Sequence, residues 1–324
     1  GNYNTVVGDE AGTAITTGTE NTLIGTFAGD ALTTGLENTA LGYAALSSDR
    51  FGKYSTAIGN LALNDQNYAS ATSAYNTAVG YRAGLEVTTG VENTLIGGLA
   101  GDALTTGAYN TVVGKDALGA GTSSSYNVAI GRAALSANTT ADNNTAVGYK
   151  ALLANTTGAN NVAVGNYALD ANTTAANNTA VGYLSLSANT TGAENVAVGN
   201  YTLDANTTAS NNTAVGYGSL SSNTTGASNV AVGNYTLDAN ITGAANTAVG
   251  YNALSASTTG TSNVALGTYA LDANTTASNN TAVGYASLTA NTTGTYNVAL
   301  GTATGAAVTT GVQNTFIGGL AGDA

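Results

Sequence analysis

The chain has 324 residues, a formal net charge of −12, and no Cys, His, Met, Trp or Pro. The absence of Cys excludes disulfides and thiol chemistry, and without Cys and His the usual zinc ligands and nucleophile–base pairs are missing too. The six basic residues all lie in the first half and form no stripe, so neither nucleic acid nor an anionic membrane is an expected partner.

One motif recurs at a fixed interval along the chain: Asn, then Thr or Val, a small apolar residue, an aliphatic residue and Gly. Its Gly returns nineteen times, first at Gly8, Gly25 and Gly42 and last at Gly318, with one four-residue insertion after Gly59. A fixed period of this size is typical of a solenoid, in which each repeat is one coil stacked on the last. The sequence therefore predicts an all-β fold, a parallel β-solenoid of the β-roll type with one coil per seventeen residues and about 19 coils.

Regularity changes along the chain. Residues 1–142 are expected to form less regular coils, with an insertion near 64–75, and residues 143–324 regular coils of the same continuous solenoid. From Asn144 onward, Asn-Thr-Ala-Val-Gly-Tyr alternates with Asn-Val-Ala-Val-Gly-Asn-Tyr, a true period of 34 that indicates either duplication of a coil pair or two kinds of outward ridge. Because the chain starts and stops inside the pattern, we expect it to be a segment of a longer protein.

The coil that begins at Asn178 shows the expected elements. Residues 179–181 are β-branched and apolar and predict a short strand, which Gly182 ends. Residues 184–186 read as a second short strand, and residues 189–192 have turn chemistry. Helix is disfavoured, because the apolar spacing is wrong and Gly, Thr and Asn dominate.

Three columns of the repeat are predicted to build the interior. Structural glycines, needing positive φ or close backbone approach, are Gly148, Gly165, Gly182, Gly199, Gly216, Gly233 and Gly250. A ladder of stacked asparagines, whose amides bond coil to coil, is Asn144, Asn161, Asn178, Asn195, Asn212 and Asn229. The core aliphatic residues are Val147, Val164, Val181, Val198, Val215 and Val232.

The predicted strand is apolar on both faces, since Val181 points one way and Ala180 the other. A doubly apolar strand requires a second covering surface, which association with further copies would supply. Where the Ala180 column holds a large residue, Gly tends to follow six residues on, as Gly29 follows Leu23. This trend indicates volume compensation, either within one coil or between chains.

The repeat resembles a known class of surface protein. Its motif Asn-Thr-Ala-Val-Gly-Tyr-x-Ala-Leu, with Thr-Thr-Gly before the next Asn, resembles the head repeats of trimeric autotransporter adhesins, and even more the related repeats of phage tail fibres and other large surface proteins. The resemblance covers the entire chain. It implies a left-handed β-roll in which three chains intertwine as a homotrimer, although the adhesin coil is shorter than the repeat of this chain.

Candidate chemistry is sparse, and no catalytic, cofactor-binding or metal-binding residue is predicted. A row of Asp at 34-residue spacing recurs about 9.6 Å apart at strand spacing, too far to share a metal ion. Asparagines in sequons are candidate glycosylation sites, although an Asn/Thr-rich turn creates sequons by composition alone. Some of them also have Asp two residues earlier, among them Asn172, Asn206 and Asn274. The insertion and residues 49–54 are the best candidate for a local recognition patch.

The resulting functional prediction is a non-enzymatic structural fibre or adhesin shaft. It would be extracellular, on a cell or virion surface, and would hold a repetitive polar surface or a distal tip for attachment. The expected partners are further copies of the chain, as a homotrimer or filament, and a host-surface receptor or glycan, with no nucleic acid, no membrane insertion and no cofactor. Two alternatives stay open: a filament subunit that stacks end to end, and a monomeric ice- or glycan-binding solenoid.

Overall fold

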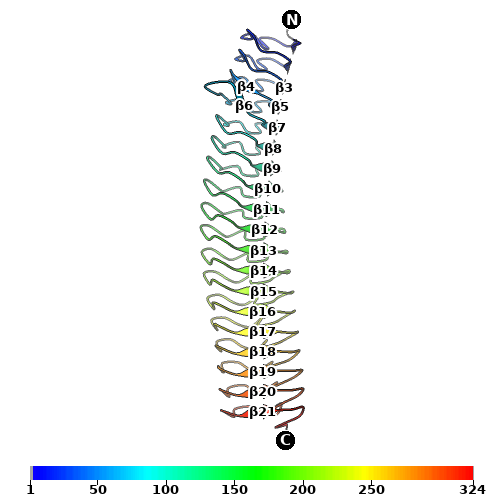
Figure 1. Cartoon of the computed structure of the whole chain (residues 1–324), viewed down its shortest axis with the longest axis vertical. Helices are drawn as coiled ribbons and strands as arrows, with labels where there is room; N and C mark the ends of the chain where they lie inside the picture. The colour runs from blue at the N-terminus through cyan, green and yellow to red at the C-terminus, as the bar shows by residue number, and fades with distance from the viewer. Residues whose placement is uncertain (1–2, 324) are drawn as a thin grey trace. The chain divides into compact units, whose positions relative to one another are not determined.

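The computed structural model describes residues 3–323 and divides into two compact units, Gly1–Asn161 and Val162–Ala324. Within the described residues there are short strands and turns but no helix. In each unit, every strand of the main column pairs in parallel with the equivalent strand of the next coil, as Thr179 pairs with Val196 (Figure 1). The predicted all-β parallel β-solenoid, with one coil for each repeat of the sequence motif, is therefore confirmed.

Most strands span three residues and occupy the same place in each coil. In the first unit they are β1 (Thr5–Val7), β2 (Thr22–Ile24), β3 (Thr39–Leu41), β5 (Thr56–Ile58), β7 (Thr77–Val79), β8 (Thr94–Ile96), β9 (Thr111–Val113), β10 (Val128–Ile130) and β11 (Thr145–Val147). In the second unit they are β12 (Val162–Val164), β13 (Thr179–Val181), β14 (Val196–Val198), β15 (Thr213–Val215), β16 (Val230–Val232), β17 (Thr247–Val249), β18 (Val264–Leu266), β19 (Thr281–Val283), β20 (Val298–Leu300) and β21 (Thr315–Ile317).

The expected second strand is wrong: residues 184–186 lie in a turn. Leu184 and Leu186 both have φ of 53°, in the left-handed region, so the chain bends twice instead of extending. Alternating leucines imitate the period of a strand, but here the same spacing sends Leu186 into the core and leaves Leu184 half-buried. A left-handed residue costs about 1–2 kcal/mol, which burial of a Leu side chain, at about 1.5–3 kcal/mol, offsets.

Backbone hydrogen bonds between coils continue through this turn although it is not a strand. The amide of Leu186 donates to the carbonyl of Thr202 in the next coil at 3.0 Å, and the amide of Tyr201 donates back to the carbonyl of Tyr183 at 3.0 Å. Each coil is thereby bonded to its neighbours along the turn as well as along the strand, which satisfies groups that burial would otherwise penalise.

The core of each coil lies between the middle of the strand and the inner residue of this turn. Ala180 and Leu186 are fully buried in the representative coil. Other coils reverse the sizes: Leu23 on the strand faces Gly29 in the turn, where an added Cβ would lie 2.8 Å from Leu23 Cδ2 and 2.9 Å from Leu32 Cδ1. The volume compensation read from the sequence therefore operates inside a single chain.

Compensation also extends to the following coil, as two turn glycines that follow a small Ala on their own strand show. Gly84 follows Ala78, but a Cβ on Gly84 would lie 2.6 Å from Leu95 of the next coil. Gly305 follows Ala299, and its Cβ would lie 3.0 Å from the ring of Phe316. Each turn glycine thus makes room for a large residue on its own strand, on the next strand, or on both.

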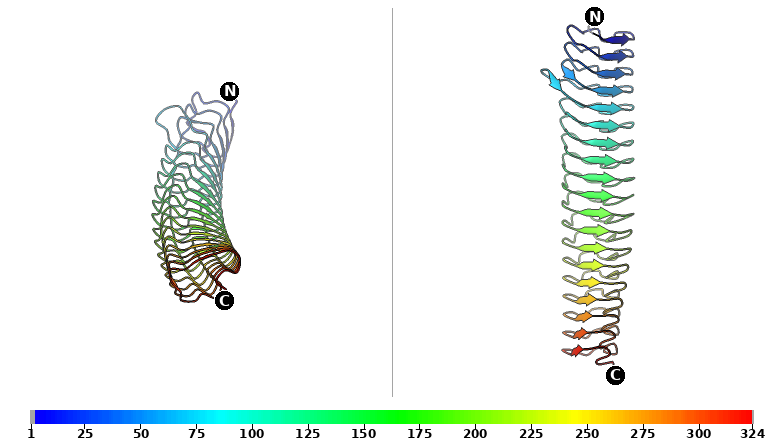
Figure 2. Two further views of the ribbon diagram at one scale, coloured as in Figure 1. Left: turned by 60° about the horizontal axis from the view of Figure 1, so that its bottom comes forward. Right: turned by 45° about the vertical axis from the view of Figure 1, so that its right-hand side comes forward.

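The insertion lies in the first unit and forms a small sheet of its own. Strands β4 (Gly52–Lys53) and β6 (Thr72–Ser73) pair in parallel, and Leu36 makes an isolated bridge to Lys53. Figure 2 shows the two short strands on the side of the stack, away from the column of three-residue strands. The longer coil is accommodated there without disturbing the pairing of β5 with β7.

Candidate functional site

The glycine column has the two properties that the sequence suggested. The seven predicted glycines have φ between 132° and 140°. A Cβ on Gly216 would lie 2.5 Å from the carbonyl oxygen of Gly233, and one on Gly233 would lie 2.7 Å from that of Gly250. These positions therefore need glycine both for conformation and because the backbones of neighbouring coils approach each other closely.

The predicted asparagine ladder lies in the interior, with all six side chains buried. The side-chain oxygen of Asn178 accepts the backbone N–H of Asn195 at 3.0 Å, and that of Asn195 accepts the backbone N–H of Asn212 at 3.0 Å. The amide nitrogen of Asn195 donates to the carbonyl of Ala209 at 2.9 Å. The ladder thus links each coil to the next and fixes the turn within its own coil.

The sequon asparagines form a second interior ladder that the sequence analysis missed. Asn172, Asn206 and Asn274 are all fully buried. The amide nitrogen of Asn206 donates to the side-chain oxygen of Asn189 at 2.9 Å and to the carbonyl of Ala209 at 3.0 Å. The folded chain does not present the nitrogen that a glycan would join, so the glycosylation prediction at Asn172, Asn206 and Asn274 is corrected.

The predicted core valines lie on the outer face of the sheet instead. Val164 is 37% exposed, and the others are half-buried, namely Val147, Val181, Val198, Val215 and Val232. The alternation of strand side chains places Ala180 inside and Thr179 and Val181 outside, and the space opposite Ala180 is filled by Leu186. The assignment of these valines to the core of the single chain is therefore wrong.

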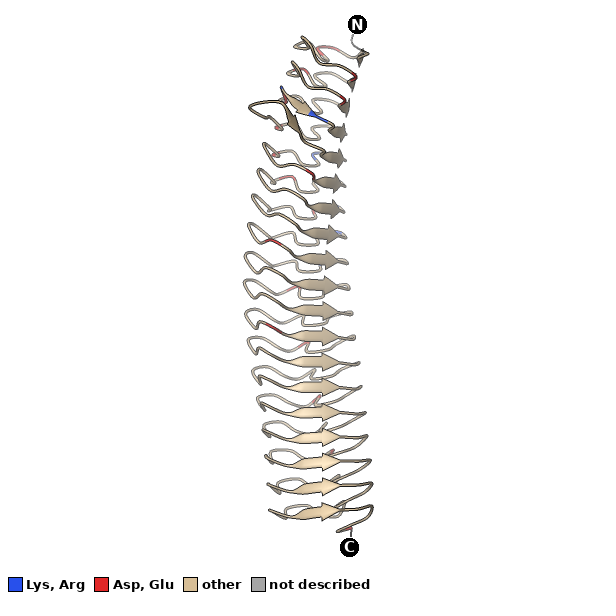
Figure 3. Cartoon of the chain, in the orientation of Figure 1, with Lys and Arg blue, Asp and Glu red and all other residues tan. Residues whose placement is uncertain are grey.

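This outer strand face is defined by the first and third residues of the three-residue strands. In both units every such pair consists of Thr or Val followed by Val, Ile or Leu, and none is charged. Figure 3 shows these strands without charged residues, whereas acidic and basic residues colour the turns and the insertion. The strand face is thus an uncharged surface of Thr and aliphatic side chains on an acidic chain.

Where the insertion interrupts the first asparagine ladder, a buried polar cluster replaces it. Ser55 stands in the ladder position, and Gln66 donates to the Ser55 hydroxyl at 2.9 Å and to Asp49 Oδ2 at 2.8 Å. Asn76 then donates to Gln66 Oε1 at 2.9 Å and to the Tyr68 hydroxyl at 3.2 Å. The cluster carries the hydrogen bonding across the longer coil.

Burial has electrostatic consequences in this cluster. It raises the pKa of the Asp49 carboxyl above its ordinary value, although hydrogen bonds from Gln66 and from the backbone of Gly52 act in the opposite direction. Burial, together with the nearby charge of Asp49, also raises the pKa of the Tyr68 hydroxyl. The Tyr68 hydroxyl donates to the carbonyl of Gly90 at 2.7 Å. These groups hold the insertion in place and are closed to solvent.

The candidate recognition patch is therefore smaller than the sequence suggested, because Asp49 belongs to the interior. On the outside, Tyr54 and Tyr75 stack with ring centroids 4.9 Å apart, and Tyr75 is 54% exposed. The guanidinium of Arg50 lies 4.9 Å from the centroid of the Phe51 ring. This aromatic and basic surface is on the side of the stack that carries β4 and β6.

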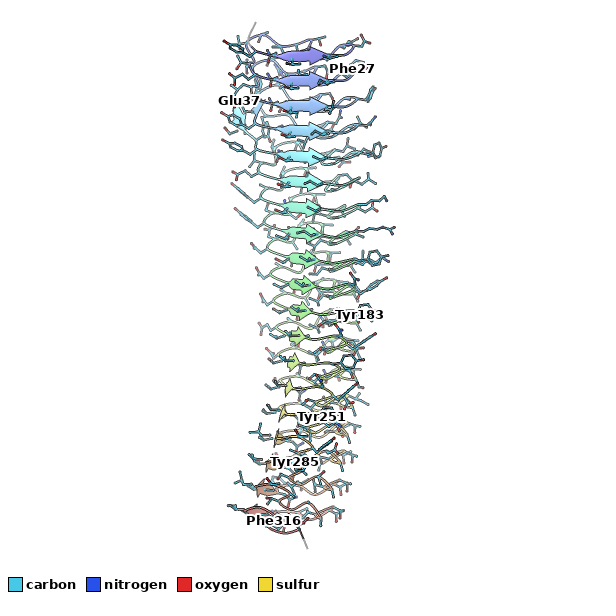
Figure 4. The ribbon with its side chains drawn as sticks, turned by 90° about the vertical axis from the view of Figure 1, so that its right-hand side faces the viewer. Phe27, Glu37, Tyr183, Tyr251, Tyr285 and Phe316 are labelled. Atoms are coloured by element: carbon cyan, nitrogen blue, oxygen red, sulfur yellow. The ribbon has the colours of Figure 1, made fainter. Side chains whose placement is uncertain are left out.

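A tyrosine ladder runs along the second unit and is explained by the 34-residue period. Seven rings make successive edge-to-face contacts, with centroids between 5.4 and 6.4 Å apart: Tyr183, Tyr201, Tyr217, Tyr235, Tyr251, Tyr269 and Tyr285. Alternate rings follow the column glycine by one or by two residues. The alternation thus produces one ladder of perpendicular neighbours and not two ridges. Figure 4 labels three of its members, Tyr183, Tyr251 and Tyr285.

The remaining polar rows offer little chemistry. Thr190 donates its hydroxyl to the carbonyl of Thr207 at 3.1 Å, and this bond recurs in other coils, so one Thr row is committed to coil stacking. Burial raises the pKa values of Asp204 and Asp238 in the acidic row. Among the described residues no three acidic side chains gather in a way that could hold a metal ion, and no pocket is present.

Neither protein-family models nor curated proteins give a relative for this chain. Across residues 3–323, none of the secondary structure is a helix of the length and apolar character that spanning a membrane requires. The candidate sites are thus the strand face, the insertion patch and the tyrosine ladder.

Proposed function

We propose that this chain is a non-enzymatic segment of an extracellular fibre or adhesin shaft on a cell or virion surface, assembled from three copies that meet at their strand faces. The observation that carries the proposal is the charge-free row of half-exposed aliphatic side chains, one in every coil. A soluble protein rarely leaves so regular an apolar surface uncovered. The choice of three copies over two follows the resemblance of the repeat to trimeric adhesin and tail-fibre repeats.

Charge favours a second copy as the occupant of this face. The chain carries a net charge of −12, so two copies repel each other through their turns but not through uncharged strands. Ten strands of three residues in the second unit project about 500 Å² of sheet, against roughly 800 Å² per partner in a standard stable interface. The nine equivalent strands of the first unit add a similar area.

The proposed role is mechanical. Stacked coils held by two asparagine ladders and a glycine column are a scaffold with identical surfaces at short intervals, suited to holding a tip or a repetitive surface away from its anchor. The interior amides are committed to coil stacking, and the acidic residues lie scattered along the turns. These features support a structural segment over an enzyme.

The test is the mass of the purified chain in solution, measured by light scattering with negative-stain images. The matched variants place three lysines on the strand face (Val181→Lys, Val198→Lys, Val215→Lys) or on exposed turn positions (Thr191→Lys, Thr208→Lys, Thr225→Lys). We expect a threefold mass for the parent and the turn variant, and single chains for the face variant. A single-chain mass for the parent would overturn the proposal, and polymers of constant width would favour the end-to-end filament.

A further inference from the structure

The tyrosine ladder of the second unit is packed like a structural element but exposed like a binding surface. Tyr183, Tyr217 and Tyr251 are 41%, 44% and 44% exposed, and Tyr285 is 56% exposed. Within the described residues, none of the seven ladder hydroxyls makes a hydrogen bond to another protein group. The ladder therefore presents ring surface and solvated hydroxyls that a ligand can contact.

We propose that this ladder is a binding track for a neutral, extended, β-1,4-linked glycan. Sugar rings stack their axial C–H faces on aromatic rings and satisfy their hydroxyls with amide and phenol groups. The ladder supplies both kinds of contact along its length. It also offers little to other ligand classes, because it has no pocket for a compact molecule and no cation for an anionic one.

The charge around the tyrosine ladder favours a neutral ligand over an anionic one. Residues 162–324 contain no Lys or Arg. The acidic residues Asp204, Asp238 and Asp272 follow Tyr201, Tyr235 and Tyr269 by three positions each. A sulfated or uronic-acid polymer would be repelled along the whole track, whereas an uncharged polysaccharide would not.

The spacing between equivalent tyrosine rings favours an extended polymer as the ligand. The four most similar rings, Tyr183, Tyr217, Tyr251 and Tyr285, each follow their column glycine directly and recur every second coil. At strand spacing this repeat is about 9.6 Å. Two pyranose rings in an extended β-1,4 chain have a length close to this, so the three disaccharides of a hexasaccharide lie near equivalent tyrosines.

Exposed amides lie next to these rings. The side-chain oxygen of Asn200 accepts the backbone N–H of Tyr183 at 2.9 Å, and that of Asn234 accepts the backbone N–H of Tyr217 at 3.0 Å. Both asparagines are exposed, and their oxygens are fixed by these bonds. With the oxygens bonded in this way, the amide nitrogens remain to donate to sugar hydroxyls.

The first experiment titrates the full chain with cellohexaose and with chitohexaose and follows tyrosine fluorescence, with calorimetry in parallel. The chain has no Trp, so the ring emission reports on tyrosine directly. We expect binding that tightens in steps from di- to tetra- to hexasaccharide, since each added disaccharide reaches one more exposed ring. Binding without length dependence, or stronger binding to an anionic oligogalacturonate, would overturn the proposal.

The second experiment uses variants of the two central exposed rings. Tyr217→Ala with Tyr251→Ala should weaken hexasaccharide binding by about tenfold or more, and Tyr217→Phe with Tyr251→Phe should weaken it less, because the rings remain. The matched control removes the stacked pair in the first unit, Tyr109→Ala with Tyr126→Ala, and should bind like the parent. The Phe variant preserves ring packing, so it keeps the test valid if the Ala variant does not fold.

The inference does not rest on trimer formation. Mass by light scattering and glycan affinity are separate readouts, so loss of one proposal leaves the other standing. Equal hexasaccharide affinity in the parent, the Ala variant and the control would show that the ladder serves packing alone.

Discussion

Two kinds of coil share one backbone in this protein, and they differ in what fills the interior. In glycine-turn coils the inner turn residue is Gly and an aliphatic residue follows three positions later, as with Gly29 and Leu32. In leucine-turn coils the inner residue is Leu and the later position is polar in nearly every case, as with Leu186 and Asn189. Both inner residues are left-handed, with φ of 54° at Gly29 and 53° at Leu186.

This difference between the coils indicates that the fold depends on compensating side-chain sizes and on satisfied polar groups more than on any one core residue. A glycine-turn coil takes its apolar volume from the strand and from the later position. A leucine-turn coil takes it from the turn and uses the freed place for an amide, which must then find partners in neighbouring coils. The long run of leucine-turn coils in the second unit supplies those partners.

The largest expected loss of stability comes from substitutions in the glycine column, which both kinds of coil share. Gly216→Ala in a leucine-turn coil and Gly25→Ala in a glycine-turn coil each place a Cβ 2.5 Å from a neighbouring carbonyl oxygen, at φ of 132° and 129°. We expect each to lower the free energy of unfolding by about 3–5 kcal/mol. Urea unfolding followed by circular dichroism measures the loss.

Gly98→Ala is the matched control for the glycine column, because an added Cβ there meets nothing within 4 Å. It should change the stability by less than about 0.5 kcal/mol. A similar small loss at Gly216 and Gly25 would mean that the coils can move apart, contrary to the close approach described above.

The next largest loss of stability is expected when the residue three positions after the inner turn residue is exchanged between the two kinds of coil. Leu104→Asn puts an amide into a glycine-turn coil, where the second asparagine ladder is absent. Asn206→Leu removes an amide from that second ladder and leaves Asn189 Oδ1 without its donor. Each change should lower the stability by about 2–4 kcal/mol, from lost apolar burial in the first and an unsatisfied buried acceptor in the second. Thermal unfolding measures both.

The informative contrast for this pair is Asn206→Asp, which keeps the shape of the side chain but removes the donor. It should be at least as damaging as Asn206→Leu, because it adds a buried charge. If both Asn206 variants were as stable as the parent, the second ladder would contribute nothing to coil stacking.

Sequence periodicity is sufficient to predict the residues that every coil needs for its backbone conformation and stacking. The glycine column and the first asparagine ladder recur without regard to coil type, so the period of the motif identifies both. Which face of the strand is buried could not be predicted, because Ala180 and Val181 are both apolar and the choice depends on Leu186 across the coil. The prediction of inward valines is therefore wrong because it depends on hydrophobicity alone.

Two other misses have local causes. Residues 184–186 resemble a strand in sequence because left-handed leucines are rare, yet Gly12 and Gly29 at the equivalent inner position are a readable sign of positive φ. The second ladder is hidden because Asn-Thr-Thr has the composition of an exposed turn. Its register with the aliphatic Leu32 and Leu104 is the signal that this position points inward.

A smaller effect, on the pH dependence of stability, is expected at the boundary between the two kinds of coil. There the buried carboxyl of Asp49 lies three positions after the inner turn residue. Because burial raises its pKa in the folded state, the folded chain favours the protonated form. The free energy of unfolding should be greatest below the ordinary Asp pKa and should fall as the pH rises through the raised folded value. Unfolding midpoints from pH 3 to pH 8 measure this slope, from about one unit below the ordinary value upward.

The control for Asp49 is Asp49→Asn, which does not titrate. The stability of the parent relative to this variant should increase as the pH falls. Comparing the two proteins at each pH cancels the contributions of Asp30, Asp102, Asp204 and Asp238, whose pKa values are raised by burial as well. A parent that loses stability relative to Asp49→Asn on acidification would contradict the assignment.

The smallest predicted effect is a gain, and it tests whether the second ladder is limited by its own gaps. Ser257 interrupts the ladder, and the side-chain oxygens of Asn240 and Ser257 are buried without a hydrogen-bond partner among the described residues. Ser257→Asn would place an amide nitrogen where equivalent coils donate to the preceding asparagine and to the carbonyl three residues on, as Asn223 does at 3.0 Å to both. We expect about 1 kcal/mol of added stability, seen as a higher unfolding midpoint. Ser257→Ala should give no such gain, because it supplies no donor to Asn240, and equal midpoints for the Asn and Ala variants would mean that continuity of the amide ladder does not matter in this coil.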